Sequence, residues 1–426
     1  MLNDPFVQWL LVAIKALVFI VALLTGFAYM TWGERRIVAR MQWRLGPNKV
    51  GPFGLLQPLA DGLKLLFKEQ LQPKEAKTFL FVLAPMISLV VALCAYAVIP
   101  VDVAPYNIAG YKLEPWVANP NIAVLYLLGV SSLGVYGIIL GGWASNNKYA
   151  LLGAIRSSAQ VISYELALGT ALISPLLMVG SLSFLEVTHQ QLYQPFFTGN
   201  GGWFVFCQPV AFMLYWTAAV AEVNRAPFDL PEAEQELGAG YHTEYSGMKF
   251  AMFFMAEYVN MFTVSSVATV VFWGGAGSPV SFLPHGPWWF LLKVYAFMFV
   301  FIWLRATFPR FRYDQLMRIG WQFLLPMGLL NLGVTAVGVA MRWTSFEMMV
   351  ATVSMVVVLT VLSILNRKPV HAEGENHSHS LVESLESSSH GGGIPFPEAH
   401  TLEKAASDLA REALANSSSP AVKEET

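Results

Sequence analysis

Long apolar stretches dominate this sequence and restrict its fold more than any other feature. Each is close to the roughly 20 residues that an α-helix needs to cross about 30 Å of hydrocarbon. Only 13% of the 426 residues are charged, about half the share carried by soluble domains. We therefore predict an all-α polytopic membrane protein. The nine expected spans are 7–30, 79–99, 122–142, 160–180, 203–221, 250–274, 288–308, 322–340 and 346–365.

Lysine and arginine are unevenly divided between the loops. Successive loops of a polytopic protein lie on opposite sides of the membrane. The loops of one side carry 16 of these residues, and the loops of the other side carry Lys112 and Arg342. The basic loops are 31–78, 143–159, 222–249 and 309–321. Because cytoplasmic loops of membrane proteins are enriched in basic residues, the basic set is expected in the cytoplasm. With nine spans, the N-terminus then lies outside and the C-terminus lies inside.

The first basic loop, 31–78, contains a different kind of helix. Large apolar residues recur at helical spacing from Leu55 to Phe67, polar residues such as Lys64 occupy other faces, and Pro58 suits a first helical turn. This pattern predicts an amphipathic helix that lies at the membrane interface.

The C-terminal residues differ in composition from the rest. The segment 367–426 is rich in Ser, Glu and His and carries a net charge of −5. We predict a disordered acidic tail, because such a segment cannot bury enough apolar surface to fold. The sequence has no cluster of basic residues of the kind that binds nucleic acid. The expected organisation is a first membrane helix, a cytoplasmic loop, a bundle of eight further spans and the tail, at 1–30, 31–78, 79–366 and 367–426.

Ionisable residues inside the predicted spans include Lys15, Glu165, Glu257, Lys293 and Arg305. Because charge within hydrocarbon is costly, each is a candidate functional residue. Lys293 and Arg305 lie near the ends of their spans, where a long side chain can extend to the polar boundary. A carboxylate cannot extend so far, so Glu165 and Glu257 need a polar cavity or a bound proton.

The loop 222–249 is the most unusual segment. It holds six carboxylates together with Arg225 and His242. On a helix, Glu232 and Glu236 would repel each other from one face. Crowded carboxylates share protons, which suits storing and passing them. Neither metal-ligand spacing nor a nucleophile elbow is present. The two cysteines lie in apolar segments, which excludes a disulfide framework, a thiolate zinc site and a four-cysteine iron–sulfur cluster within this chain.

Several long motifs resemble the family that contains the H subunit of bacterial respiratory complex I and mitochondrial NADH dehydrogenase subunit 1. The match runs from about residue 7 to 340, so the ninth span and the tail lie outside it. The motifs are Gly33-Glu-Arg-Arg-Ile-Val-Ala-Arg-Met-Gln42, Arg44-Leu-Gly-Pro-Asn48, Gln57-Pro-Leu-Ala-Asp-Gly-Leu-Lys-Leu65, Ser163-Tyr-Glu165 and Ala221-Glu-Val-Asn-Arg-Ala-Pro-Phe-Asp-Leu-Pro-Glu-Ala-Glu-Gln-Glu-Leu237.

The resemblance implies a membrane subunit of proton-pumping NADH-quinone oxidoreductase, a translocase of electron transport in the bacterial inner membrane. In this family the subunit anchors the peripheral arm and forms, with two soluble subunits, a chamber for ubiquinone or menaquinone. Its acidic residues begin a proton path toward antiporter-like subunits. The implied partners are the quinone-module subunits of the arm, small membrane subunits and the lipid bilayer. No cofactor is expected in this chain, since NADH, FMN and iron–sulfur clusters belong to partner subunits.

The resemblance also implies roles for individual residues. The quinone chamber and its entrance would use Glu34, Arg35, Arg44, Asp61, Lys64, Arg225, Arg305 and Arg310. The proton path would use Glu165, Glu222, Glu232, Glu234, Glu236, Glu244 and Glu257. The charge pattern points independently to Glu165, Glu257 and the acidic loop, whereas Glu34 and Asp61 rest on the resemblance.

Three alternatives remain open. A related subunit of a membrane-bound hydrogenase would share the spans and several glutamates, although the complete motif from Ala221 to Leu237 favours the quinone enzyme. A stand-alone ion carrier often shows internal repeats, and no convincing repeat is present. A purely structural anchor would leave the charges inside the spans unexplained.

Overall fold

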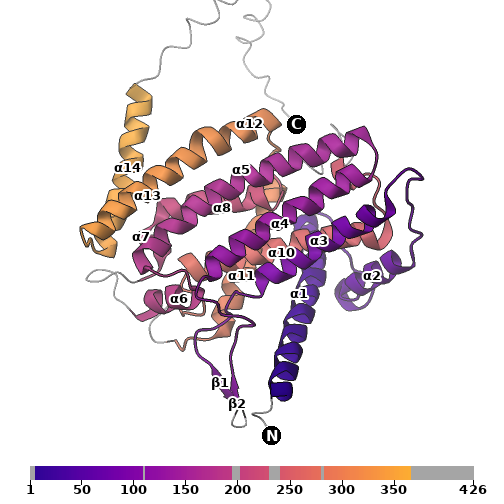
Figure 1. Ribbon diagram of the computed structural model, residues 1–426, viewed down its shortest axis with the longest axis horizontal. Coiled ribbons are helices and arrows are strands. Elements are labelled where there is room, and N and C mark those ends of the chain that lie inside the picture. Colours follow the sequence, from indigo (N-terminus) through magenta and orange to yellow (C-terminus); the bar gives the residue numbers. More distant parts are fainter. Residues whose placement is uncertain (1–4, 109–110, 194–201, 230–239, 280–282, 366–426) are drawn as a thin grey trace, which may run out of the picture. The chain divides into compact units, whose positions relative to one another are not determined.

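The computed structural model describes residues 5–108, 111–193, 202–229, 240–279 and 283–365 (Figure 1). Helices form almost all of the regular structure in these ranges. They are α1 (Pro5–Met41), η1 (Pro52–Gly54), α2 (Gln57–Phe67), α3 (Thr78–Tyr96), α4 (Ala123–Ala144), α5 (Lys148–Val179), α6 (Phe184–Tyr193), α7 (Phe204–Cys207), α8 (Pro209–Glu222), η2 (Gly240–His242), α10 (Gly247–Phe272), α11 (Pro287–Thr307), α12 (Tyr313–Arg318), the π-helix η3 (Ile319–Leu324), α13 (Leu325–Ala340) and α14 (Ser345–Leu365). A short antiparallel hairpin pairs β1 (Tyr106–Ile108) with β2 (Tyr111–Leu113).

Eight helical segments of the described chain are long and apolar enough to cross a membrane. They are Leu10–Met41, Thr78–Tyr96, Ala123–Ala144, Lys148–Val179, Gly247–Phe272, Pro287–Thr307, Tyr313–Ala340 and Ser345–Leu362. This confirms the predicted all-α polytopic fold.

The predicted span 203–221 is divided into two helices. Helix α7 ends at Cys207 and α8 begins at Pro209, which has no backbone N–H to continue a helix. Helix α8 has 14 residues, which corresponds to about 21 Å, less than the hydrocarbon thickness. Tyr215 and Ala218 of α8 are buried against the rest of the bundle.

Two helices are longer than the hydropathy pattern predicted. Helix α1 continues to Met41, beyond the predicted end of the first span at residue 30. Helix α5 begins at Lys148, where the side chain of Asn147 accepts a hydrogen bond from the amide of Tyr149 at 3.0 Å. Hydropathy marks where a helix meets hydrocarbon, but capping and packing decide where the helix ends.

The amphipathic helix predicted in the first loop is confirmed as α2, with Pro58 in its first turn. Leu59, Leu63 and Leu66 are all exposed. The apolar face of α2 is therefore not covered by the described part of this chain, and it is available to lipid or to a partner.

Small residues allow the central helices to pack closely. Helix α4 packs between α3 and α5, α10 packs on α3, and α8 and α13 pack on α5 (Figure 1). A Cβ added at Gly137 would lie 2.1 Å from Oγ of Ser88 on α3, and one added at Gly142 would lie 2.3 Å from Cβ of Ala154 on α5. Glycine at these positions permits the short distances between helices.

The chain divides into two units at residues 359 and 360. The structure describes only 360–365 of the second unit, which belong to the end of α14. The predicted disordered tail, 367–426, lies outside the described residues, so it remains a prediction.

Lys293, which lies near the end of its predicted span, is buried by contacts with the chain that follows α10. It is 5% exposed, and its ammonium donates hydrogen bonds to the carbonyls of Trp273 at 2.6 Å, Gly275 at 3.0 Å and Gly277 at 2.7 Å. The ring of Trp203 lies 4.3 Å away. All three ammonium donors are used, and they satisfy carbonyls that follow the end of α10.

Replacing Lys293 with methionine should therefore destabilise the folded chain. Three carbonyls would lose their partner, and each unsatisfied buried group costs about 1–3 kcal/mol. We expect a lower midpoint of thermal unfolding in detergent than for Lys68→Met, a matched change at an exposed lysine. Equal midpoints for Lys293→Met and Lys68→Met would show that the hydrogen bonds from Lys293 to the three carbonyls do not stabilise the fold.

Candidate functional site

The candidate site is built where α8 ends. The amide of Asn224 donates to the carbonyl of Ala221, and the amide of Arg225 donates to that of Val220. Asn224 has φ 55°, in the left-handed region that asparagine adopts more readily than most residues. This turn ends the helix and allows Arg225 to be buried directly behind it.

Gln160, on α5, holds this turn in place. Its Nε2 donates to the carbonyls of Ala221 and Phe228, both at 2.8 Å, and the residue is completely buried. Phe228 stacks on Phe311 with 5.3 Å between ring centroids, and the amide of Phe311 donates to the carbonyl of Pro227 at 3.0 Å. The turn is thus fixed between α5 and the segment that follows α11.

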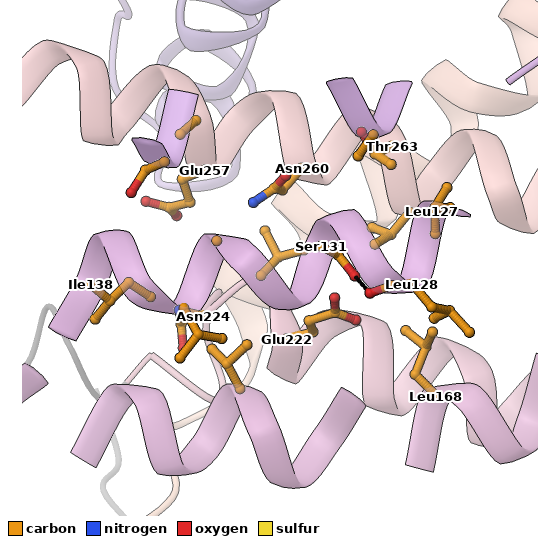
Figure 2. Close-up of a pocket in the computed structure, with 18 of the residues that line it drawn as sticks. Leu127, Leu128, Ser131, Ile138, Leu168, Glu222, Asn224, Glu257, Asn260 and Thr263 are labelled. Atoms are coloured by element: carbon orange, nitrogen blue, oxygen red, sulfur yellow. Dashed lines mark hydrogen bonds between the residues drawn. The ribbon is translucent and has the colours of Figure 1, made fainter. Parts of the chain in front are cut away.

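An internal cavity lies beside the turn (Figure 2). Its polar lining includes Glu222 at the end of α8, Asn224, and Glu257 and Asn260 of α10, and leucines such as Leu168 form apolar parts of the wall. The volume open to water is about 90 Å³, enough for several water molecules. Figure 2 shows side chains from separate helices that face this common space.

Glu165 is placed close to this cavity. The hydroxyl of Ser132, on α4, donates a hydrogen bond to Oε1 of Glu165. The carboxylates of Glu165 and Glu222 are near enough to interact electrostatically. Two of the predicted proton-path residues therefore interact electrostatically.

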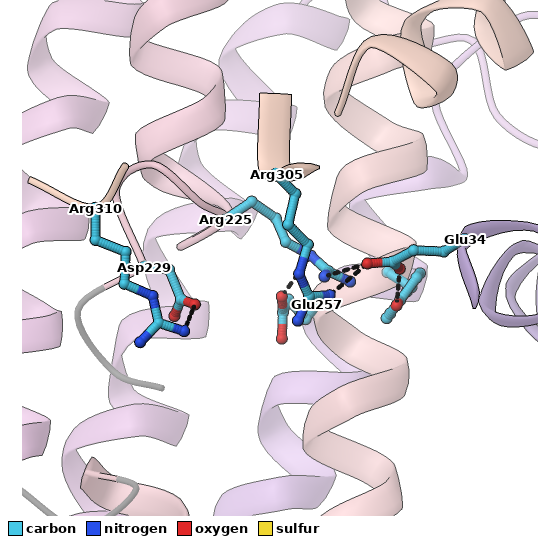
Figure 3. A network of polar contacts seen from close by, with 7 residues as sticks. Glu34, Arg225, Asp229, Glu257, Arg305 and Arg310 are labelled. Carbon is cyan, nitrogen blue, oxygen red and sulfur yellow. Dashed lines mark hydrogen bonds and ion pairs between the residues drawn. The ribbon is translucent and has the colours of Figure 1, made fainter. Parts of the chain in front are cut away.

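Two arginines and two glutamates form a charge cluster next to the cavity (Figure 3). Nη1 of Arg225 lies 3.3 Å from Oε1 of Glu34, and Nε lies 2.8 Å from Oε1 of Glu257. Arg305 also pairs with Glu34. The hydroxyl of Tyr258 donates to Oε2 of Glu34, and the Tyr258 ring lies 4.3 Å from the Arg225 guanidinium.

The formal charges of the two arginines and two glutamates cancel. Arg225 is 4% exposed and Glu34 is 7% exposed, whereas 37% of the Arg305 side chain is exposed. Buried charges are tolerated when each is paired and hydrogen-bonded. Glu257 belongs both to this cluster and to the cavity lining. A change of charge in the cluster therefore alters the electrostatic potential in the cavity over a short distance.

A second charged contact joins α1 to the interfacial helix α2. Nη1 of Arg35 lies 2.7 Å from Oδ2 of Asp61, and Nε2 of Gln57 donates to Oδ1 of Asp61 at 3.0 Å. Arg35 follows Glu34 directly in α1. The charge cluster and the interfacial helix are therefore connected through adjacent residues of one helix.

Other predicted residues lie apart from the charge cluster. Nε of Arg44 donates to the side chain of Gln42 at 2.7 Å, and both Arg44 and Lys64 are exposed. Arg310 instead pairs with Asp229, whose carboxylate lies 3.1 Å from Nη2 of Arg310.

The predicted acidic loop lies only partly within the described chain. Glu244 lies in a surface recess, where Nδ2 of Asn147 donates to its Oε1 at 2.8 Å. It does not line the internal cavity. Glu232, Glu234 and Glu236 lie outside the described residues, so their role remains a prediction.

The charge pattern did not single out several residues that build the site. Asp229 is one of six acidic residues of the loop, and nothing in the sequence sets it apart, although its side chain is 3% exposed. Tyr258 follows Glu257 directly, and a polar aromatic residue beside a buried carboxylate is a usable signal. Gln160 gave no signal, because its two carbonyl partners lie 61 and 68 residues away.

A family model and three known proteins that match this chain all belong to NADH dehydrogenase or NADH-quinone oxidoreductase. The family model for NADH dehydrogenase matches residues 14–336. One of the H subunits of NADH-quinone oxidoreductase from Geobacter sulfurreducens is 51% identical over 348 residues, which cover 79% of this chain and 97% of that protein. The corresponding protein of Thermus thermophilus, numbered 8 among the subunits of the enzyme, is 53% identical over 339 residues, which cover 79% and 88%. The H subunit of Thermomicrobium roseum is 52% identical over 325 residues, which cover 75% and 93%.

Proposed function

Because the chain belongs to the NADH dehydrogenase family, among the H subunits of NADH-quinone oxidoreductase, we propose that it forms part of the quinone-binding chamber of that enzyme and begins its proton path. One observation carries this proposal. Glu257 is a member of the charge cluster with Arg225 and also lines the cavity that contains Glu222. A charge change beside the quinone is thereby coupled to proton-binding groups inside the membrane domain.

The surroundings of the charge cluster suit an amphiphilic substrate. A groove of about 270 Å³ between α1 and α11 is lined by apolar residues that include Met30, Phe299 and Ile302. Ile302 also lines the small cavity at Glu34 and Arg305. Ligand sites commonly combine apolar walls with a few polar groups that fix orientation. A quinone has this character, with an apolar tail and two carbonyl oxygens.

Reduction of a quinone takes up two electrons and two protons. The electrons would come from partner subunits, and no set of three His, Cys, Asp or Glu residues in the described ranges is arranged to hold a metal ion. This chain would contribute groups that respond to the change of charge. Glu34 and Glu257 are paired with arginines. Glu222 and Glu165 instead lie near each other, with Ser132 as the hydrogen-bond donor to Glu165, and are better suited to exchange protons.

We further propose the partners and orientation that the family implies. The chain would dock the quinone-module subunits of the peripheral arm on its basic loops and pack against small membrane subunits. It would lie in the bacterial inner membrane, with its N-terminus outside and its C-terminus in the cytoplasm. The exposed apolar face of α2 supports a place at the boundary between lipid and partner subunits.

Charge reversal at Asp61 tests the proposed entrance. Lysine at this position would stand beside Arg35 and Lys64, so three like charges would repel one another along the interfacial helix. We expect turnover of long-tailed quinones to fall severalfold, with a smaller effect on short-tailed analogues. The measurement is kcat and KM for both quinones in enzyme verified as fully assembled.

Asp61→Asn is the matched control, since it removes the pair with Arg35 without adding a positive charge. The pair is exposed, and such pairs contribute about 1 kcal/mol or less, so assembly should survive in both variants. Unchanged kinetics for both quinones in Asp61→Lys would contradict a quinone entrance at this helix.

A further inference from the structure

Three buried polar atoms in the wall of the internal cavity have no hydrogen-bond partner among the described residues. They are Oε2 of Glu222, Oδ1 of Asn224 and Nδ1 of His242. A buried polar atom without a partner is unfavourable, and ordered water normally satisfies such atoms where a polar cavity has room for it. All three residues line a cavity with about 90 Å³ open to water, so ordered water in this cavity is the nearest candidate partner for these atoms.

His242 is held in a defined position at this cavity. It lies at the end of η2, where its ring centroid is 3.7 Å from that of Tyr241, and the edges of Phe250 and Phe253 face it at 5.7 and 5.6 Å. Burial lowers the pKa of His242 to about 3, so the imidazole is neutral at physiological pH. One ring nitrogen of a neutral imidazole is a hydrogen-bond acceptor.

His242 and Glu244, two residues apart in the chain, line two different spaces. Glu244, two residues later, lies in the surface recess with Asn147. Glu222 lies at the end of α8, in the wall of the same cavity as His242. His242 and Glu222 therefore line one cavity that has room for water between them.

We propose that His242 is a positioning residue of the proton path, whose Nδ1 accepts a hydrogen bond from cavity water and so holds a water chain that leads past Asn224 to Glu222. This inference rests on the proposed proton path. When the first water molecule receives a proton from bulk solvent, each water molecule gives up one proton as it receives another, and the Glu222 carboxylate binds the last one. The imidazole stays neutral throughout and orients the first water molecule.

Two amide substitutions test the position of the acceptor. The amide of asparagine occupies nearly the place of Nδ1, whereas the amide of glutamine occupies nearly that of Nε2. Both are polar and similar in size, so assembly should be comparable. We expect His242→Asn to keep quinone-dependent NADH oxidation and membrane-potential formation near the wild-type rate. We expect His242→Gln and His242→Phe, which keeps the aromatic packing, to lose about tenfold in both.

The solvent deuterium isotope effect separates positioning of water from a structural role. If proton transfer through the cavity becomes rate-limiting, the isotope effect on quinone-dependent turnover rises in His242→Gln and His242→Phe and stays at the wild-type value in His242→Asn. A role in packing alone would lower the rates without raising the isotope effect. Equal rates and equal isotope effects in all three variants would overturn the proposal.

Glu222→Gln distinguishes this inference from the proposed function. If Glu222→Gln blocks turnover while His242→Gln and His242→Phe behave as wild type, the proton path stands and the role of His242 is overturned. If Glu222→Gln is fully active, the proton path itself is wrong, and the inference falls with it. If the Phe variant does not assemble, the comparison of His242→Asn with His242→Gln still decides the outcome.

Discussion

Replacing Arg225 with methionine should nearly abolish the assembled, active enzyme. Arg225 is 4% exposed and contacts both Glu34 and Glu257. Without it, the two carboxylates would share the single positive charge of Arg305. Removing one member of a buried ion pair costs about 3–5 kcal/mol, which is a large part of the roughly 5–15 kcal/mol that stabilises a typical protein.

Three further variants make this prediction specific. Arg225→Lys keeps the charge but not the planar donors that reach two carboxylates at once, so we expect partial loss. Arg312→Met is the control, because Arg312 and Asp314 form an exposed pair with a separation of 3.5 Å, and such pairs contribute little. Adding Glu257→Leu to Arg225→Met restores the balance of charge and should recover part of the assembly, although not the proton path.

The measurement is the amount of assembled enzyme in membranes, by native electrophoresis, together with quinone-dependent NADH oxidation. A normal amount of active enzyme with Arg225→Met would show that the charge cluster is not needed for folding or for function. Normal assembly without activity would assign the arginine to the reaction alone.

Glutamine at Glu222 should block coupled turnover while leaving assembly intact. Glutamine is nearly isosteric with glutamate but cannot take up or release a proton. Glu222 faces the cavity, and its Oε2 has no hydrogen-bond partner in the described part of the chain. Within the described part of the chain, Glu222→Gln therefore removes no hydrogen bond to Oε2. If the carboxylate passes protons, quinone-dependent turnover should fall by roughly a hundredfold, a typical effect of removing a proton-transfer group.

Glu165→Gln should behave in the same way. The amide carbonyl of glutamine can still accept the hydrogen bond from Ser132, so the structural contact survives while the proton site is lost. Glu257→Gln should differ from both, because Arg225 would lose half of its neutralising charge. It should lower assembly as well as turnover.

Three rates measured on one preparation test this second prediction. NADH oxidation by an artificial acceptor that bypasses the quinone should stay normal, whereas quinone-dependent oxidation and membrane-potential formation should fall together. If Glu165→Gln and Glu222→Gln both keep full quinone turnover and full potential, the carboxylates are structural. The chain would then be an anchor and a wall of the chamber.

Local patterns accounted for most of the fold. Eight membrane helices and the interfacial helix α2 follow from runs and repeats of apolar residues, which are properties of neighbouring positions. The division of 203–221 at Gln208 was not anticipated, although Pro209 was visible in the sequence as a break. Hydropathy also placed the end of the first helix too early, because α1 continues as a polar helix to Met41.

Local patterns accounted for less of the candidate site. They identified Glu165 and Glu257 as costly charges within membrane helices, and the family resemblance added Glu34 and Arg225. They gave no reason to choose Gln160, they did not single out Tyr258, and they marked His242 only as one member of the acidic loop. Each of these acts through contacts made in the folded chain, such as the hydrogen bond from Tyr258 to Glu34 across 224 positions.

The order of apolar and polar residues was therefore sufficient to locate eight of the nine predicted spans in the described chain, and it showed which charges must be accommodated among them. The pairing of those charges came from the packing of distant helices: Glu34 meets Arg225 and Arg305 across 191 and 271 positions of the chain. Electrostatic interaction in a low-dielectric interior depends steeply on distance. The distances between charged side chains of different helices cannot be read from a short-range sequence pattern. Lys293 illustrates the same point, since its place near the end of a span suggested exposure, whereas packing buried it against three carbonyls beyond α10.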